Sequence, residues 1–139
     1  MTTATGSAPA PLLRRILLQG KYEAATMLRN GEQLILDLLE RRERDQIDNV
    51  YLMRLEQFYP WPMKSLMTEL ARFPNAELVW CQEEPLNMGA WSYIFPRLER
   101  AVGCKIRYAG RGTASSPAAG SKAMQYREQK ALVAQAFEV

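Results

Sequence analysis

Four short apolar runs alternate along the chain with longer segments of helical periodicity. Each run ends at Gly, Pro or a cluster of polar residues, which is typical of strands buried in a sheet. The run that begins at Val50 is apolar on both alternating faces, as expected for a strand covered on both sides. The pattern predicts strands at residues 14–20, 50–58, 77–81 and 105–108.

The intervening segments carry apolar residues at helical spacing. Residues 63–71 are the clearest example, with apolar side chains at i, i+3, i+4, i+7 and i+8. Asn30-Gly31 is a dipeptide that favours a turn or a helix stop, and Pro96 is expected to break or delay the helix around it. The predicted helices are residues 21–29, 32–45, 63–71, 91–102 and 121–137.

Strands that alternate with helices predict an α/β fold. We expect three layers: a mostly parallel sheet of four or five strands, with helices on both faces. Full burial of Leu52, Leu55, Val79 and Trp80 should contribute roughly 1.5–3 kcal/mol per side chain. Residues 1–11 are small, polar and proline-containing, so we interpret them as a flexible tail before a single domain at 12–139.

Composition excludes several classes of protein. The 139 residues include no histidine, which removes Ser-His-Asp and Cys-His catalysis and His-ligated zinc. The two cysteines, Cys81 and Cys104, form no CxxC unit. No run approaches the roughly 18–20 apolar residues of a membrane span. Without a secretory signal, two lone thiols favour a reducing compartment, the cytoplasm or the mitochondrial matrix.

Charge is modest and unevenly spread. The chain has 18 basic and 15 acidic residues, and residues 97–139 hold eight of the basic ones. A basic C-terminal third can attract phosphates, but a nucleic-acid-binding domain is usually more strongly charged. We therefore expect neither nucleic acid nor a membrane as a partner.

Ligands of parallel α/β sheets bind beyond the carboxyl ends of the strands. Gly20-Lys21 stands at one such end, where it could hold a phosphate or form a tight turn. Glu83-Glu84 follows another strand and suits a helix cap or an ion pair. The loop after the last strand is the most suggestive, since it is either a phosphate or nucleotide site or an ordinary basic surface loop. Its candidate residues are Arg107, Arg111, Ser115, Ser116, Ser121 and Lys122.

Long stretches of the chain resemble a known family. VYLMRLEQFYPWP, RFPNAELVWCQEEP and NMGAW between residues 50 and 91, and RYAGR followed by ASSPAAG, are similar to the C-terminal domain of the decarboxylating component of 2-oxoglutarate dehydrogenase. The resemblance covers about residues 12–139. It departs from the family at Gln19, where Ser is usual, at Gly112, where Pro is usual, and in about twelve extra residues after Lys21.

The resemblance implies a transketolase-like C-terminal domain of a thiamine-diphosphate-dependent enzyme. That enzyme decarboxylates 2-oxoglutarate and passes a succinyl group to a lipoyl arm. Thiamine diphosphate and magnesium belong to upstream domains, so no cofactor should bind this chain, and alone it should not decarboxylate. The alternative is a stand-alone regulatory module for acetyl-CoA or an adenine nucleotide. The implied effector residues are Lys21, Arg54, Gln82, Arg107, Arg111, Ser115 and Ser116.

The resemblance also implies partners: the remaining domains or subunits of the dehydrogenase complex, with a homodimer as one arrangement. Aromatic and methionine residues near strand ends should remain exposed in part and form the contact. We expect the loops Phe58–Met63 and Asn87–Trp91 to carry it. The residues concerned are Met53, Phe58, Tyr59, Trp61, Met88 and Trp91.

Overall fold

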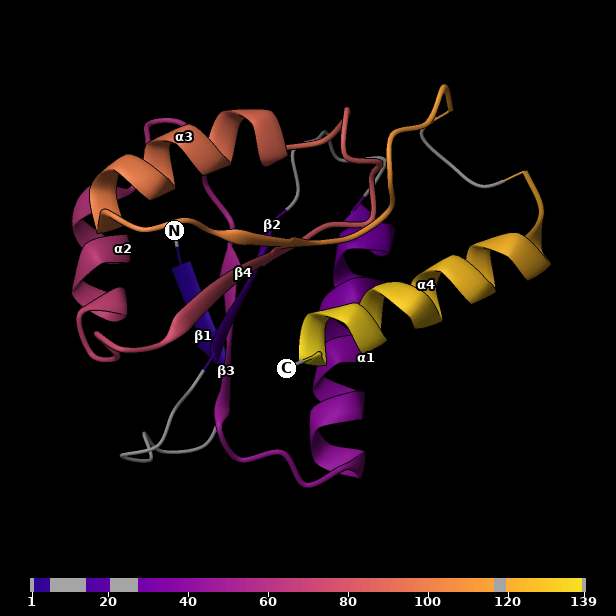
Figure 1. The fold of residues 1–139 in the computed structure, drawn as a ribbon, viewed down its shortest axis with the longest axis horizontal. Helices are drawn as coiled ribbons and strands as arrows, with labels where there is room; N and C mark the ends of the chain where they lie inside the picture. Colours follow the sequence, from indigo (N-terminus) through magenta and orange to yellow (C-terminus); the bar gives the residue numbers. More distant parts are fainter. Residues whose placement is uncertain (1, 6–14, 21–27, 117–119, 139) are drawn as a thin grey trace.

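The computed structural model describes residues 2–5, 15–20, 28–116 and 120–138. Helices and strands alternate along most of this part of the chain (Figure 1). The strands are β1 (Thr2–Thr5), β2 (Arg15–Gly20), β3 (Val50–Leu55), β4 (Glu77–Cys81) and β5 (Arg107–Ala109). The helices are α1 (Leu28–Arg44), α2 (Met63–Leu70), α3 (Trp91–Val102) and α4 (Lys122–Phe137).

These strands form one sheet in the order β1-β3-β2-β4-β5. The pairs β3-β2, β2-β4 and β4-β5 are parallel, and only β1 pairs antiparallel, with β3. The predicted α/β class with a mostly parallel sheet is therefore confirmed. Because β2 to β5 all run the same way, the segments after β3, β4 and β5 leave the sheet at one edge, called here the carboxyl edge.

Each face of the sheet is covered by its own pair of helices (Figure 1). Helices α2 and α3 pack on the face that carries Trp80, and α1 and α4 pack on the face that carries Val79. Alternation along β3 and β4 sends successive side chains to the two faces, so both faces are apolar. Leu52, Leu55, Val79 and Trp80 are all buried, as the sequence predicts.

Two helix boundaries differ from the sequence prediction. Asn30-Gly31 does not stop a helix, because α1 runs continuously from Leu28 to Arg44. A glycine within a helix costs about 1 kcal/mol relative to alanine, and the burial of Leu34, Ile35 and Leu38 on the sheet outweighs that cost. The predicted helix at 21–29 otherwise falls on residues 21–27, outside the described part. Pro96 lies inside α3 without ending it.

The tail prediction is wrong for Thr2–Thr5, which form β1 beside β3. Threonine favours strands, but a four-residue edge strand lacks the apolar run that marks the other strands. Residues 6–11 lie outside the described part. Strand β3 also ends at Leu55 rather than at Phe58, and β5 begins at Arg107, two residues later than predicted.

Candidate functional site

The carboxyl edge is organised around Gln82, the first residue after β4. Its side chain is fully buried, with 0% exposure, although it is polar. Its Oε1 accepts hydrogen bonds from Trp80 Nε1 at 2.9 Å and from the Trp91 backbone N–H at 3.1 Å. A buried amide is tolerated only when its hydrogen-bonding groups find partners. Gln82 meets that condition by joining the end of β4 to the start of α3.

The amide nitrogen of Gln82 closes the loop between these elements. Nε2 lies 3.1 Å from Glu84 O, 3.0 Å from Pro85 O and 2.9 Å from Met88 O. The two N–H protons of Nε2 donate to three carbonyl oxygens, so one N–H is shared between two acceptors. The loop at residues 83–90 is therefore wrapped around one side chain and has a fixed shape.

A second set of bonds ties this loop to the segment after β5. Asn87 exchanges two hydrogen bonds with Ala114: its Nδ2 donates to the Ala114 carbonyl at 2.9 Å, and its Oδ1 accepts from the Ala114 N–H at 3.1 Å. The Leu86 N–H donates to Arg111 O at 3.1 Å. The two segments therefore behave as one rigid surface, called here the carboxyl-edge plate and defined as residues 83–90 and 110–116.

Tyr108 lies beneath this plate. Its hydroxyl is 2.9 Å from Arg111 O and 3.3 Å from Glu84 O, and donates to these carbonyls. Burial raises the pKa of Tyr108 to about 12, so the phenol keeps its proton at neutral pH. The ring also packs against Trp91, with 5.2 Å between centroids. Tyr108 is thus a structural donor rather than an acid or base.

Two glycines are required by this packing. A Cβ on Gly110 would stand 2.5 Å from the Tyr108 hydroxyl and 3.0 Å from Gln82 O. Gly89 has a φ of +68°, in the left-handed region that side-chain-bearing residues rarely adopt. Both positions need glycine for the loops to approach the end of the sheet.

The predicted effector residues do not all gather at this edge. Arg107 begins β5, at the opposite end of that strand from the plate. Its guanidinium pairs with Glu77 at 3.0 Å and donates to the carbonyls of Gln135, Ala136 and Glu138. It therefore fastens the end of α4 to the sheet. Arg107 thus lies apart from the other predicted residues, Gln82 is buried in the loop, and Lys21 lies outside the described residues.

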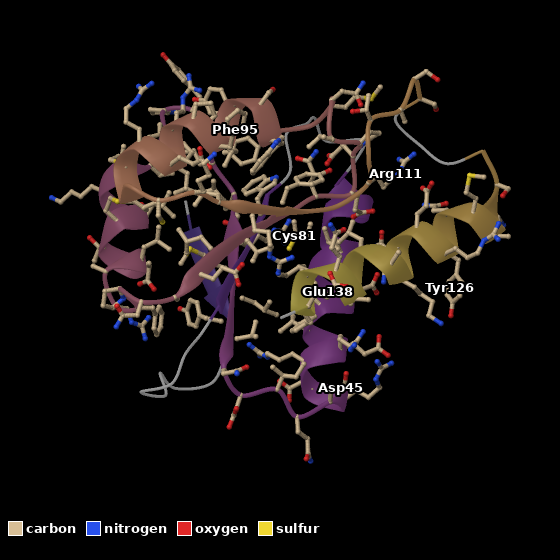
Figure 2. The ribbon with its side chains drawn as sticks, viewed as in Figure 1. Asp45, Cys81, Phe95, Arg111, Tyr126 and Glu138 are labelled. Carbon is tan, nitrogen blue, oxygen red and sulfur yellow. The ribbon has the colours of Figure 1, made fainter. Side chains whose placement is uncertain are left out.

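The other effector residues remain at the carboxyl edge. Arg54 is near the end of β3 and half-buried, and Ser115 and Ser116 are exposed on the plate. Arg111 is mostly buried and pairs through Nε with Glu128 of α4 at 2.8 Å. Figure 2 shows Arg111 on the segment that follows β5, above α4 in this view. The sequence thus located the edge correctly but could not separate its structural residues from its accessible ones.

A groove of about 510 Å³ lies between α1 and α4. Its walls mix basic side chains such as Arg41 and Lys130 with acidic ones such as Asp37 and Glu40. Asp37 accepts hydrogen bonds from Gln33 Nε2 at 2.8 Å and from Gln129 Nε2 at 3.0 Å. The mixed charges favour neither an anion nor a cation.

The described residues form neither a cluster of metal ligands nor a membrane-spanning helix. No group of three or more of their Cys, Asp or Glu side chains is placed to hold a metal ion. None of the helices in residues 28–44, 63–70, 91–102 and 122–137 combines the length and apolarity needed to cross a bilayer.

The chain was compared with known proteins. The family model described as 2-oxoglutarate dehydrogenase C-terminal matches residues 24–137, most of the chain. The chain belongs to this family. Curated relatives include the 2-oxoglutarate dehydrogenase E1 components of Brucella anthropi, Brucella ovis and Brucella canis. Each is 57% identical over 90 residues, which is 60% of this chain and 9% of the relative.

Membership of the 2-oxoglutarate dehydrogenase C-terminal family confirms the resemblance read from the sequence. The motif stretch QEEP to NMGAW now has a physical role in this domain: it is the loop folded around Gln82. Sequence reasoning missed Asn87 and Tyr108 as the residues that fix the plate. Their partners are main-chain carbonyl and N–H groups, and no residue pattern identifies such groups.

Proposed function

We propose that this chain acts as the terminal α/β domain of a 2-oxoglutarate dehydrogenase E1 component and completes that enzyme without carrying its chemistry. The family match over residues 24–137 supports the proposal most directly. The two-faced, mostly parallel sheet is consistent with the three-layer, transketolase-like arrangement implied by the resemblance. The carboxyl edge supports it further, because the buried polar groups of Gln82 and Tyr108 form internal hydrogen bonds.

The activity belongs to the whole enzyme in this proposal. The complete component decarboxylates 2-oxoglutarate with thiamine diphosphate and magnesium held by the preceding domains, and passes the succinyl group to a lipoyl arm. The partners of this chain are then those domains, assembled as a homodimer in the cytoplasm. The isolated chain is expected to release no carbon dioxide from 2-oxoglutarate, even with cofactor added.

Assembly of a chimera tests this proposal. The Brucella anthropi relative would carry this chain in place of its own matching C-terminal segment. We expect sedimentation to show the same subunit number as for the intact relative. The relative cut before that segment is the matched control and should lose that assembly or precipitate. A chimera that behaves like the truncated control would contradict the proposal.

The effector site implied by the resemblance stays a prediction. Arg54, Arg111, Ser115 and Ser116 are the members that the carboxyl edge still offers. An anionic effector would compete with Glu128 for Arg111. Calorimetric titration of the chimera with acetyl-CoA should give a saturable binding signal. Arg111→Ala should remove this signal, and Arg127→Ala should leave it unchanged. No heat with the unmodified chimera would end this prediction.

A further inference from the structure

Two segments of the described surface each expose a tyrosine and a methionine. The first is the aromatic turn, defined as residues 58–63, between β3 and α2. Tyr59 of this turn is 85% exposed and Met63 is 42% exposed. The second is on the outer half of α4, defined as residues 122–130, where Tyr126 is 64% exposed and Met124 is 44% exposed. Exposure alone does not separate them, but the charges around them do.

Hydrogen bonds hold the aromatic turn in shape. Tyr93 Oη donates to Phe58 O at 3.0 Å, and Gln57 Nε2 donates to Pro60 O at 3.0 Å. Within the turn, the Met63 N–H donates to Trp61 O at 2.8 Å. Prolines at 60 and 62 restrict the backbone further. A surface that is already ordered loses little entropy on binding, which favours association.

The chemistry of the turn also fits an interface. None of its six residues is charged, and it contains Tyr, Trp and Met. Interface cores are enriched in these residues and depleted in charges. The sequence predicted that some of six contact candidates remain exposed, and Tyr59 does. The others are half-buried or, for Met53, fully buried; the half-buried ones are Phe58, Trp61, Met88 and Trp91.

The outer half of α4 differs from the aromatic turn in the charges around its exposed side chains. Lys122, Arg127 and Lys130 are exposed on this half of the helix, and Lys130 Nζ lies 5.2 Å from the centre of the Tyr126 ring. Figure 2 shows Tyr126 on the part of α4 that extends away from the sheet. Burying this surface would require desolvation of several charges. It is suited to water rather than to an apolar partner.

We propose that the aromatic turn is the surface on which this domain docks against the catalytic part of the dehydrogenase component. The inference rests on the proposed function. The matched segment is 9% of each relative, and the family is C-terminal, so nearly all of a relative's polypeptide lies on its N-terminal side. That polypeptide is the occupant, and the surface it presents to Tyr59 and Met63 is apolar.

Hydroxyl-radical footprinting tests the docking surface, because Tyr and Met side chains are oxidised only where water reaches them. The isolated chain and the Brucella anthropi chimera would be compared side chain by side chain. Oxidation of Tyr59 and Met63 should fall at least fivefold in the chimera. Tyr126 and Met124 are the matched pair and should change less than twofold.

Each outcome decides the inference. Equal oxidation of Tyr59 in a correctly assembled chimera overturns it and leaves the proposed function standing. Equal oxidation in a chimera that does not assemble ends both. If Tyr59 becomes protected in the isolated chain as its concentration rises, a second copy occupies the turn, and the assignment to the catalytic part is wrong.

Discussion

Gln82 and Gln129 have the same side chain in two different regions of the molecule. Gln82 is buried at the carboxyl edge, where its Nε2 donates to three carbonyl oxygens and its Oε1 accepts hydrogen bonds from two N–H groups. Gln129 lies on the outer half of α4, and its side-chain Nε2 donates a hydrogen bond to Asp37. Water can replace the partner of Gln129, but it cannot reach the partners of Gln82. The contrast separates the carboxyl edge, whose polar groups are buried, from the polar groove between α1 and α4, which water reaches.

The same contrast explains where function can reside. The carboxyl-edge plate and the aromatic turn keep their shape because internal bonds fix their backbones. The groove between α1 and α4 instead has charged walls that water and salt can screen. Specific recognition therefore suits the edge more than the groove.

Gln82→Ala should give the largest loss of stability. It leaves the buried Trp80 indole and several loop carbonyls without partners, at about 1–3 kcal/mol for each buried group. We expect the free energy of unfolding to fall by about 3–5 kcal/mol in urea titrations. Gln129→Ala is the matched control and should cost less than about 1 kcal/mol. Similar losses for both variants would erase the distinction between the two regions.

Arg107→Ala should have the next largest effect. The change removes the donor to three carbonyls at the end of α4 and the ion pair with Glu77. Charge-assisted bonds of this kind support a loss of about 2 kcal/mol. Arg127→Ala, on the exposed outer half of the same helix, should stay within about 0.5 kcal/mol. Thermal unfolding would show both, and equal effects would contradict the role given to Arg107.

Alkaline pH should weaken the edge moderately. Burial raises the pKa of Cys81 from 9.0 to about 12, and that of Tyr108 from 10.0 to about 12. The fold therefore favours both protonated forms. Their contribution to stability is complete below about pH 9 and is lost as pH rises towards 12.

Denaturant titrations from pH 7 to 10.5 would follow this loss. Cys81→Ala should make the decline shallower just above pH 9, where only the unfolded thiol ionises. Cys104 is exposed, so Cys104→Ala serves as the control and should leave the slope unchanged. A slope that is insensitive to Cys81→Ala would show that burial does not hold this thiol protonated.

Much of the fold could be predicted from local patterns. The apolar runs that became β3 and β4 are buried on both faces, and such runs have few alternatives. The helix boundary at Asn30-Gly31 was missed because packing of Leu34 and Leu38 overrides the weak preference of that dipeptide. Strand β1 was missed because its pairing with β3 depends on backbone bonds across about fifty residues.

The site was only partly predictable for a related reason. Residue types beyond the strand ends identified the carboxyl edge, and Arg111 is there as expected. The contacts of Arg107 with the end of α4 could not be predicted, because the sequence does not distinguish a basic residue that binds a ligand from one that binds a helix end. Its actual partners, the carbonyls of residues 135, 136 and 138, are fixed only by the folded chain.

Decarboxylation of 2-oxoglutarate by the Brucella anthropi chimera tests the central claim most directly. Carbon dioxide release would be measured with thiamine diphosphate and magnesium for the chimera, the intact relative and this chain alone. We predict turnover by the chimera within about tenfold of the intact relative, and none by the chain alone. An assembled chimera without turnover, or turnover by the isolated chain, would contradict it.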